Sequence, residues 1–165
     1  MKTSLIPLFF LLLVAAGCSS TKNAAKSEQR AADFEQMASL VESGNYVYTI
    51  QSISPTGGRT IQATTPYTMK AVDGNYEAYL PYMGRAYQAA YGGNGGIEFN
   101  GAPENLKIER NNKKNTIAVS FTIAGENDRY TVNFQVGSGG YGTLTINSQN
   151  RQGISYYGTV TKTER

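Results

Sequence analysis

One short segment, LPYMGRAYQAAYGGNGG from residue 80 to 96, places a single arginine among several tyrosines. The residues concerned are Tyr82, Arg85, Tyr87 and Tyr91. A guanidinium group can donate two parallel hydrogen bonds to a carboxylate or lie over an aromatic ring. These four residues are therefore our candidate contacts for a glycan, a peptide or a lipid head group. The alternative, which we favour, is a half-buried strand over residues 83–91 whose arginine extends to solvent.

Other catalytic and metal-binding groups are few. The chain contains no histidine and one cysteine, Cys18, which excludes a Ser–His or Cys–His pair and would leave zinc to carboxylates alone. The segment Glu126–Asp128 could offer oxygen ligands, but it lacks the spacing of a calcium loop, so a solvated turn is the better interpretation. Glu77 and Glu98 could form a carboxylate pair of the glycosidase kind, although no spacing supports this. We therefore assign no catalytic residue, no metal site and no cofactor.

A Gly-x-Gly-x-x-Gly pattern occurs in GSGGYG, residues 137–142. The dinucleotide-binding version of this pattern requires a helix to begin there, so that backbone amides face the pyrophosphate. Here the strand-like segment TLTINSQ follows instead. We predict a turn between two strands and no nucleotide site.

The first residues have the layout of an export signal. Lys2 precedes an uncharged apolar run from Leu5 to Ala16, which is shorter than the about 20 residues of a membrane-spanning helix. The run leads into VAAGC, which resembles the bacterial lipobox, a motif whose cysteine becomes lipidated. We expect Cys18 to carry acyl chains such as palmitate, and we expect no internal disulfide. The alternative is a secreted protein in which Cys18 is incidental.

The residues after the cysteine bear on location. Acyl chains anchor a protein because each buried methylene contributes about 0.8 kcal/mol. Ser19 follows Cys18, and no acidic run appears in SSTKNAAK. By resemblance to known sorting rules, this favours a lipoprotein in the outer membrane that faces the periplasm.

The charge of the chain argues against nucleic acid as a partner. The formal net charge is +3, from 15 basic and 12 acidic residues, and no clustered basic face is evident. The densest basic segment is RNNKKN, residues 110–115, between two strand-like segments. It predicts a solvated hairpin turn rather than a phosphate site.

Hydrophobic periodicity predicts one helix before the strands. Apolar residues recur at helical spacing between Ser27 and Glu42, and Gly44 stands where a helix commonly ends. The residues of this stripe are Ala31, Phe34, Ala38 and Val41. We expect an amphipathic helix that packs on the following domain, with a membrane-surface role as the alternative.

After Gly44 the pattern is that of about ten short strands, separated by turn signals such as Asp73-Gly74. Their alternation predicts an antiparallel β-sandwich or a partly closed β-barrel with one polar face. The expected organisation is a lipoprotein signal peptide at residues 1–17 and a lipid-anchored tether at 18–26. A single mainly β domain with its N-terminal helix follows at 27–165.

Several of these segments resemble one family. The segments ESGNYVYTIQSISPTGGRTIQAT, L-P-Y-x-G-R-A-Y at residues 80–87 and I-x-Y-x-G-x-V at residues 154–160 are similar to the DUF4251 family. This is a domain of unknown function in envelope lipoproteins of Bacteroidota. The resemblance implies a β-rich domain and an envelope setting, and it supplies no activity and no catalytic residue.

These observations predict a non-catalytic binding or scaffolding module in the periplasm, with an envelope protein or a glycan as partner. One alternative is a small carboxylate-dependent hydrolase or lyase, which would need two acids converging in a deep pocket. Another is a carrier of an apolar ligand, which would need an apolar cavity inside a barrel.

Overall fold

The computed structural model describes residues 18–87, 95–126 and 128–163. It contains one helix, α2 (Cys18–Glu42), and ten strands. The strands are β1 (Tyr46–Pro55), β2 (Ile61–Gln62), β3 (Thr68–Val72), β4 (Asn75–Leu80), β5 (Ile97–Gly101), β6 (Glu104–Asn111), β7 (Thr116–Ala124), β8 (Arg129–Gly137), β9 (Tyr141–Ser148) and β10 (Ile154–Lys162). The mainly β class and the expected number of strands are confirmed. The expected signal peptide at residues 1–17 lies outside the described residues.

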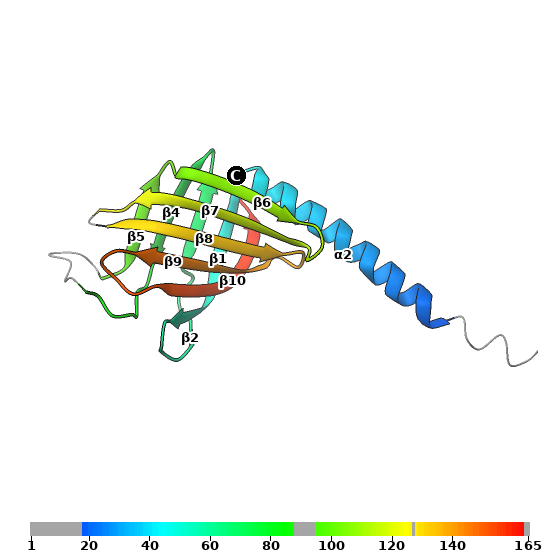
Figure 1. The fold of residues 1–165 in the computed structure, drawn as a ribbon, viewed down its shortest axis with the longest axis horizontal. Coiled ribbons are helices and arrows are strands. Elements are labelled where there is room, and N and C mark those ends of the chain that lie inside the picture. Colours follow the sequence, from blue (N-terminus) through cyan, green and yellow to red (C-terminus); the bar gives the residue numbers. More distant parts are fainter. Residues whose placement is uncertain (1–17, 88–94, 127, 164–165) are drawn as a thin grey trace, which may run out of the picture.

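All ten strands belong to one antiparallel sheet that curls into a half-barrel (Figure 1). The strand order is β5-β4-β3-β1-β10-β9-β8-β7-β6, and the short β2 pairs with β1. β3 to β5 and β6 to β10 follow the chain order, β1 pairs with β10 at the centre, and the consecutive strands β5 and β6 stand at opposite edges. The sheet curls far enough for Phe99 of β5 to form a bridge with Gly125, beyond the end of β7.

The core is formed by the inward-facing residues of these strands. Burial alternates along β7 and β8, where Ile117, Val119 and Phe121 are buried and the intervening residues are more exposed. Large rings fill the concave side: the Tyr48 and Phe134 ring centroids lie 4.7 Å apart, and those of Tyr76 and Phe121 lie 4.3 Å apart. Each such buried side chain stabilises the fold by about 1.5–3 kcal/mol. Among the described residues, these side chains pack against one another on the concave side of the sheet.

Helix α2 is longer than the sequence predicted. It begins at Cys18 rather than Ser27, and it ends at Glu42, where Gly44 has a φ of +64° that suits glycine. Phe34, Ala38 and Val41 are buried in the core, whereas residues 25–32 are all exposed. Ala31 is therefore not part of the packed stripe. The N-terminal half of the helix projects away from the sheet (Figure 1), in agreement with the exposure of residues 25–32.

An ion-pair cluster fixes the docked half of the helix to β6. Arg110 donates through Nη1 to Glu35 at 2.9 Å and through Nε to Glu42 at 2.5 Å. The hydrogen bond with Glu42 raises the pKa of Arg110, and the same contact lowers the pKa of Glu42. Arg110 therefore forms ion pairs with the helix. The predicted hairpin turn lies between the end of β6 at Asn111 and the start of β7 at Thr116.

The glycine pattern at residues 137–142 is a turn between β8 and β9, as predicted. Gly140 has a φ of +77°, and its N–H donates to the carbonyl of Gly137 at 3.0 Å. Strand β9 begins at Tyr141, so no helix N-terminus is available there for a pyrophosphate.

Candidate functional site

The candidate residues gather where three connections meet, at the end of the sheet remote from the projecting half of α2 (Figure 1). These connections are the segment after β4, the turn between β7 and β8, and the turn between β9 and β10. Residues 85–87 and 150–152 lie antiparallel, since the Tyr87 N–H donates to Asn150 at 2.8 Å and the Gln152 N–H donates to Arg85 at 3.0 Å. Ala86 and Arg151 form the bridge between them.

Arg151 lies at the centre of this junction and is only 12% exposed. Its Nη1 donates to the carbonyl oxygens of Gly95 at 3.0 Å and Gly96 at 2.6 Å. Its guanidinium carbon lies 5.3 Å from the centroid of the Tyr82 ring. The Arg151 side chain therefore binds the segment that leads into β5 to the turn before β10. We call Arg151, Asp128 and Tyr82 the arginine cluster.

Asp128 supplies the negative charge of the cluster and is 4% exposed. Its Oδ2 lies 3.9 Å from Arg151 Nε and accepts a hydrogen bond from Ser148 Oγ at 2.7 Å. Its Oδ1 accepts from Asn150 Nδ2 at 3.3 Å and from the Arg129 N–H at 2.8 Å. A buried carboxylate is costly unless it is paired and hydrogen-bonded, and Asp128 meets both conditions.

Tyr82 joins the two sides of the junction through its hydroxyl group. The hydroxyl oxygen lies 2.7 Å from the carbonyl oxygen of Arg85 and 2.9 Å from that of Gln152, so its single proton donates to one of them at a time. Burial raises the pKa of Tyr82, so the hydroxyl stays protonated at neutral pH. Tyr82 is therefore a hydrogen-bond donor to the backbone.

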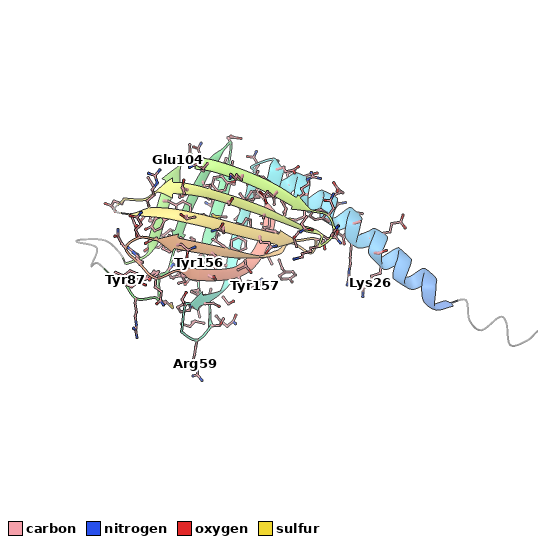
Figure 2. All side chains as sticks on the ribbon, in the orientation of Figure 1. Lys26, Arg59, Tyr87, Glu104, Tyr156 and Tyr157 are labelled. Carbon is pink, nitrogen blue, oxygen red and sulfur yellow. The ribbon has the colours of Figure 1, made fainter. Side chains whose placement is uncertain are left out.

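Beneath the junction lies Tyr156, which is fully buried (Figure 2). Its hydroxyl donates to the carbonyl of Pro81 at 2.9 Å. Burial raises the pKa of Tyr156 far above its ordinary value, and burial also raises the pKa of Tyr130 nearby. Both hydroxyl groups therefore stay protonated at neutral pH, and Tyr156 holds the loop after β4 through its hydrogen bond to Pro81.

The residues predicted from the sequence are placed as follows. Tyr82 is half-buried in the arginine cluster, whereas the Arg85 side chain is exposed. Tyr87 is 68% exposed at the end of the sheet (Figure 2). Tyr91 lies outside the described residues. The predicted strand over residues 83–91 is wrong for its described part, because residues 83–87 contain only the single bridge at Ala86.

Sequence reasoning missed Arg151 and Asp128, which are the buried ionic pair. Asp128 lies in a segment interpreted as a solvated turn, whereas its side chain is in fact almost fully enclosed. Asp128 lies in the turn before β8 and Arg151 lies in the turn after β9. Because antiparallel neighbours bring alternate turns to one end of a sheet, this spacing was a signal that the two residues lie close together.

The other considered groups have no shared site. Glu77 and Glu98 are exposed on the outer face of β4 and β5, away from the core. Among the residues that the structure describes, no cluster of three or more acidic or cysteine side chains could hold a metal ion. Over the same residues, no helix has the length and apolarity needed to span a membrane.

The fold and the junction define a class of protein: a single curled antiparallel sheet with one docked helix, whose connecting loops are tied together by a buried arginine. The chain belongs to the DUF4251 family, a domain of unknown function, whose family model matches residues 28–160. It is similar in structure to a DUF4251 family protein from Bacteroides eggerthii DSM 20697, with a TM-score of 0.59 and 18% sequence identity. That match covers 82% of this chain and 91% of the other. No curated protein matches the chain.

Proposed function

We propose that this chain is a lipid-anchored, non-catalytic binding module of the cell envelope, which a helix holds at a distance from the membrane. The observation that carries the proposal is α2, one continuous helix of 25 residues. At 1.5 Å per residue it is about 37 Å long. Its end near Glu42 is docked in the core, and residues 25–32 are exposed. Such a helix is suited to act as a spacer between an anchor and a domain.

The lipid anchor is supported by the position of the cysteine. Cys18 ends the lipobox-like VAAGC and is also the first residue of α2. Acylation of Cys18 would anchor the free end of the helix in the membrane and hold the sheet away from the membrane. The residues after Cys18 support the periplasmic side of the outer membrane as the location.

A binding role on the outer surface is supported by the packing of the interior. Buried aromatic and aliphatic side chains of the described residues fill the concave side of the half-barrel, which favours a ligand site on the outer surface. In the arginine cluster, the Arg151 and Tyr82 side chains already bind backbone carbonyls, which is a structural use of both groups. The exposed carboxylates of Glu77 and Glu98 lack the enclosure that a hydrolase site needs.

The test is the location of the Cys18→Ser variant, with Ser20→Ala as the matched control. We expect Cys18→Ser to leave the membrane fraction and lose incorporation of a labelled fatty acid, while Ser20→Ala keeps both. Retention of Cys18→Ser in membranes after a high-salt wash would overturn the anchor. Deletion of residues 19–30 should leave the unfolding temperature unchanged, because residues 25–30 are exposed. A clear decrease would show that this part of α2 supports the fold.

A further inference from the structure

The outward-facing side chains of β7, β8, β9 and β10 form a broad surface without charge. It consists of every second residue from Thr116 to Thr122, from Thr131 to Gln135, from Tyr141 to Asn147 and from Ser155 to Thr161. Each of these residues is followed or preceded by a core residue, so the sheet itself forces this set outward. The charged Arg129 stands only at its margin. We call this surface the neutral face.

Charged side chains lie on the strands beyond the neutral face. Lys107 and Glu109 belong to β6 on one side, and Lys70 belongs to β3 on the other side, beyond β1. The four strands of the neutral face span about 14 Å from the first to the last, at about 4.8 Å between neighbours. A surface of this size that is polar but uncharged favours a neutral partner, since an ion bound there would lose hydration without gaining a counter-charge.

Two tyrosines provide an aromatic contact on this face. Tyr141 of β9 and Tyr157 of β10 are 54% and 44% exposed, and Figure 2 labels Tyr157 on its strand. Their ring centroids lie 6.0 Å apart and their planes differ by 10°, so the rings are nearly parallel. Large aromatic side chains gain free energy when they are covered, and their ring faces attract weakly positive C–H groups.

A hollow of about 370 Å³ lies beside the tyrosine pair. Hydroxyl and amide groups of Ser120, Asn133, Gln135 and Thr143 line it, and Glu109 of β6 lines its edge with one negative charge, which disfavours an anionic ligand. Thr143 stands opposite Gln135 on one side and Tyr157 on the other, so the hollow continues into the aromatic pair. In the part of the chain that the structure describes, the Asn133 and Thr143 side chains have no hydrogen-bond partner, which leaves them available to a ligand.

These features fit one class of ligand. A sugar ring has a face of C–H groups that packs on an aromatic ring, and hydroxyl groups around its edge that donate to and accept from hydroxyls and amides. We propose that the neutral face binds an uncharged glycan, with Tyr141 and Tyr157 stacking on sugar rings and Asn133, Gln135 and Thr143 hydrogen-bonding the hydroxyls. This inference rests on the proposed binding function and names its ligand class.

The experiment measures retention of the full chain, purified in a detergent without a sugar head group, on two insoluble neutral polysaccharides, an α-glucan and a β-glucan. An acidic polysaccharide, polygalacturonate, is the comparison. We expect binding to at least one neutral polymer, and a decrease in affinity of about tenfold or more in Tyr141→Ala and in Tyr157→Ala. Tyr87→Ala is the matched control, because Tyr87 is also an exposed tyrosine but lies at the loop junction, and it should bind like the parent.

Added charge gives a second readout. Thr143→Lys and Thr143→Glu should both weaken binding to the neutral polymer, because either charge must be desolvated. Absence of retention on both neutral polymers overturns the proposal, as does loss of binding in Tyr87→Ala with retention in Tyr141→Ala. Stronger binding of the parent to polygalacturonate than to either neutral polymer also overturns it. Because anchoring is not needed in detergent solution, a failed glycan assay is distinguishable from a failed Cys18→Ser fractionation.

Discussion

Replacement of Arg151 by alanine, compared with replacement of the exposed Arg85, tests whether Arg151 stabilises the fold. The change removes two hydrogen bonds to the carbonyls of Gly95 and Gly96 and the contact with the Tyr82 ring. It also removes the ion-pair partner of the enclosed Asp128 carboxylate. Arg85→Ala is the matched control, since Arg85 lies in the same junction and donates no side-chain hydrogen bond to the described residues.

The expected size follows from these contacts. Hydrogen bonds that involve a charged group contribute about 1.5–3 kcal/mol each, and an arginine over a ring contributes about 0.5–1 kcal/mol or more. We discount the sum because a water molecule can replace part of the lost contact, and expect a decrease of about 3 kcal/mol in the free energy of unfolding. For a domain of this size that corresponds to a decrease in Tm of about 6–12 °C. Arg85→Ala should change Tm by at most about 2 °C.

The assay is thermal and urea unfolding of the parent, both single variants and Arg151→Ala/Asp128→Asn. In the double variant the unpaired charge is gone, so its stability should exceed that of Arg151→Ala by about 1 kcal/mol or more. The reasoning is refuted if Arg151→Ala melts within about 2 °C of the parent, or if Arg85→Ala is destabilised as much as Arg151→Ala.

Two further predictions concern the core. Burial raises the pKa of Tyr46, Tyr48 and Tyr156, so their stabilisation is fully present below about pH 10 and decreases above it, by about 4 kcal/mol per pH unit for the three together. Circular dichroism and tyrosinate absorbance should then change together in one alkaline transition, and ionisation of all tyrosines in a still-folded sheet would contradict this. At Gly158 a Cβ would overlap the carbonyl of Thr49, so Gly158→Ala should lower Tm by several degrees, while Gly139→Ala, where the nearest atom is a Tyr141 ring carbon at 3.6 Å, should be well tolerated. Equal effects of the two glycine variants in thermal unfolding would show that the close approach of β1 and β10 is not rigid.

Most strands were predicted well from the sequence, because the alternation of apolar and polar residues within a strand shows which face of that strand is buried. In β7 and β8 the alternation of Ile117, Val119 and Phe121 with polar residues reflects a sheet with one buried face, and this can be read without knowing the neighbouring strand. The helix boundary was predicted less well. Residues 25–32 of α2 are exposed, so burial imposes no hydrophobic periodicity on them that could mark where the helix begins.

The candidate site was predicted only in part, because its geometry depends on pairing between distant segments. Whether Arg85 or Arg151 becomes enclosed is decided by the antiparallel contact of residues 85–87 with residues 150–152. No local pattern reports that contact. Asp128 was likewise interpreted from its polar neighbours, whereas its burial comes from Ser148 and Asn150, about twenty positions away.

The pairing of β1 with β10 at the centre of the sheet has a consequence for how the chain folds. Tyr46 lies opposite Lys162, and Pro55 lies opposite Ile154, so the first and last long strands form the seam that joins the two halves. A loop of about a hundred residues has to close before this seam forms, and such high contact order makes folding slow. While β10 is still being synthesised, the β3–β5 half and the β6–β9 half are not yet joined at this seam. The hairpins within each half can form early, and the sheet is completed only when β10, the last strand synthesised, pairs with β1.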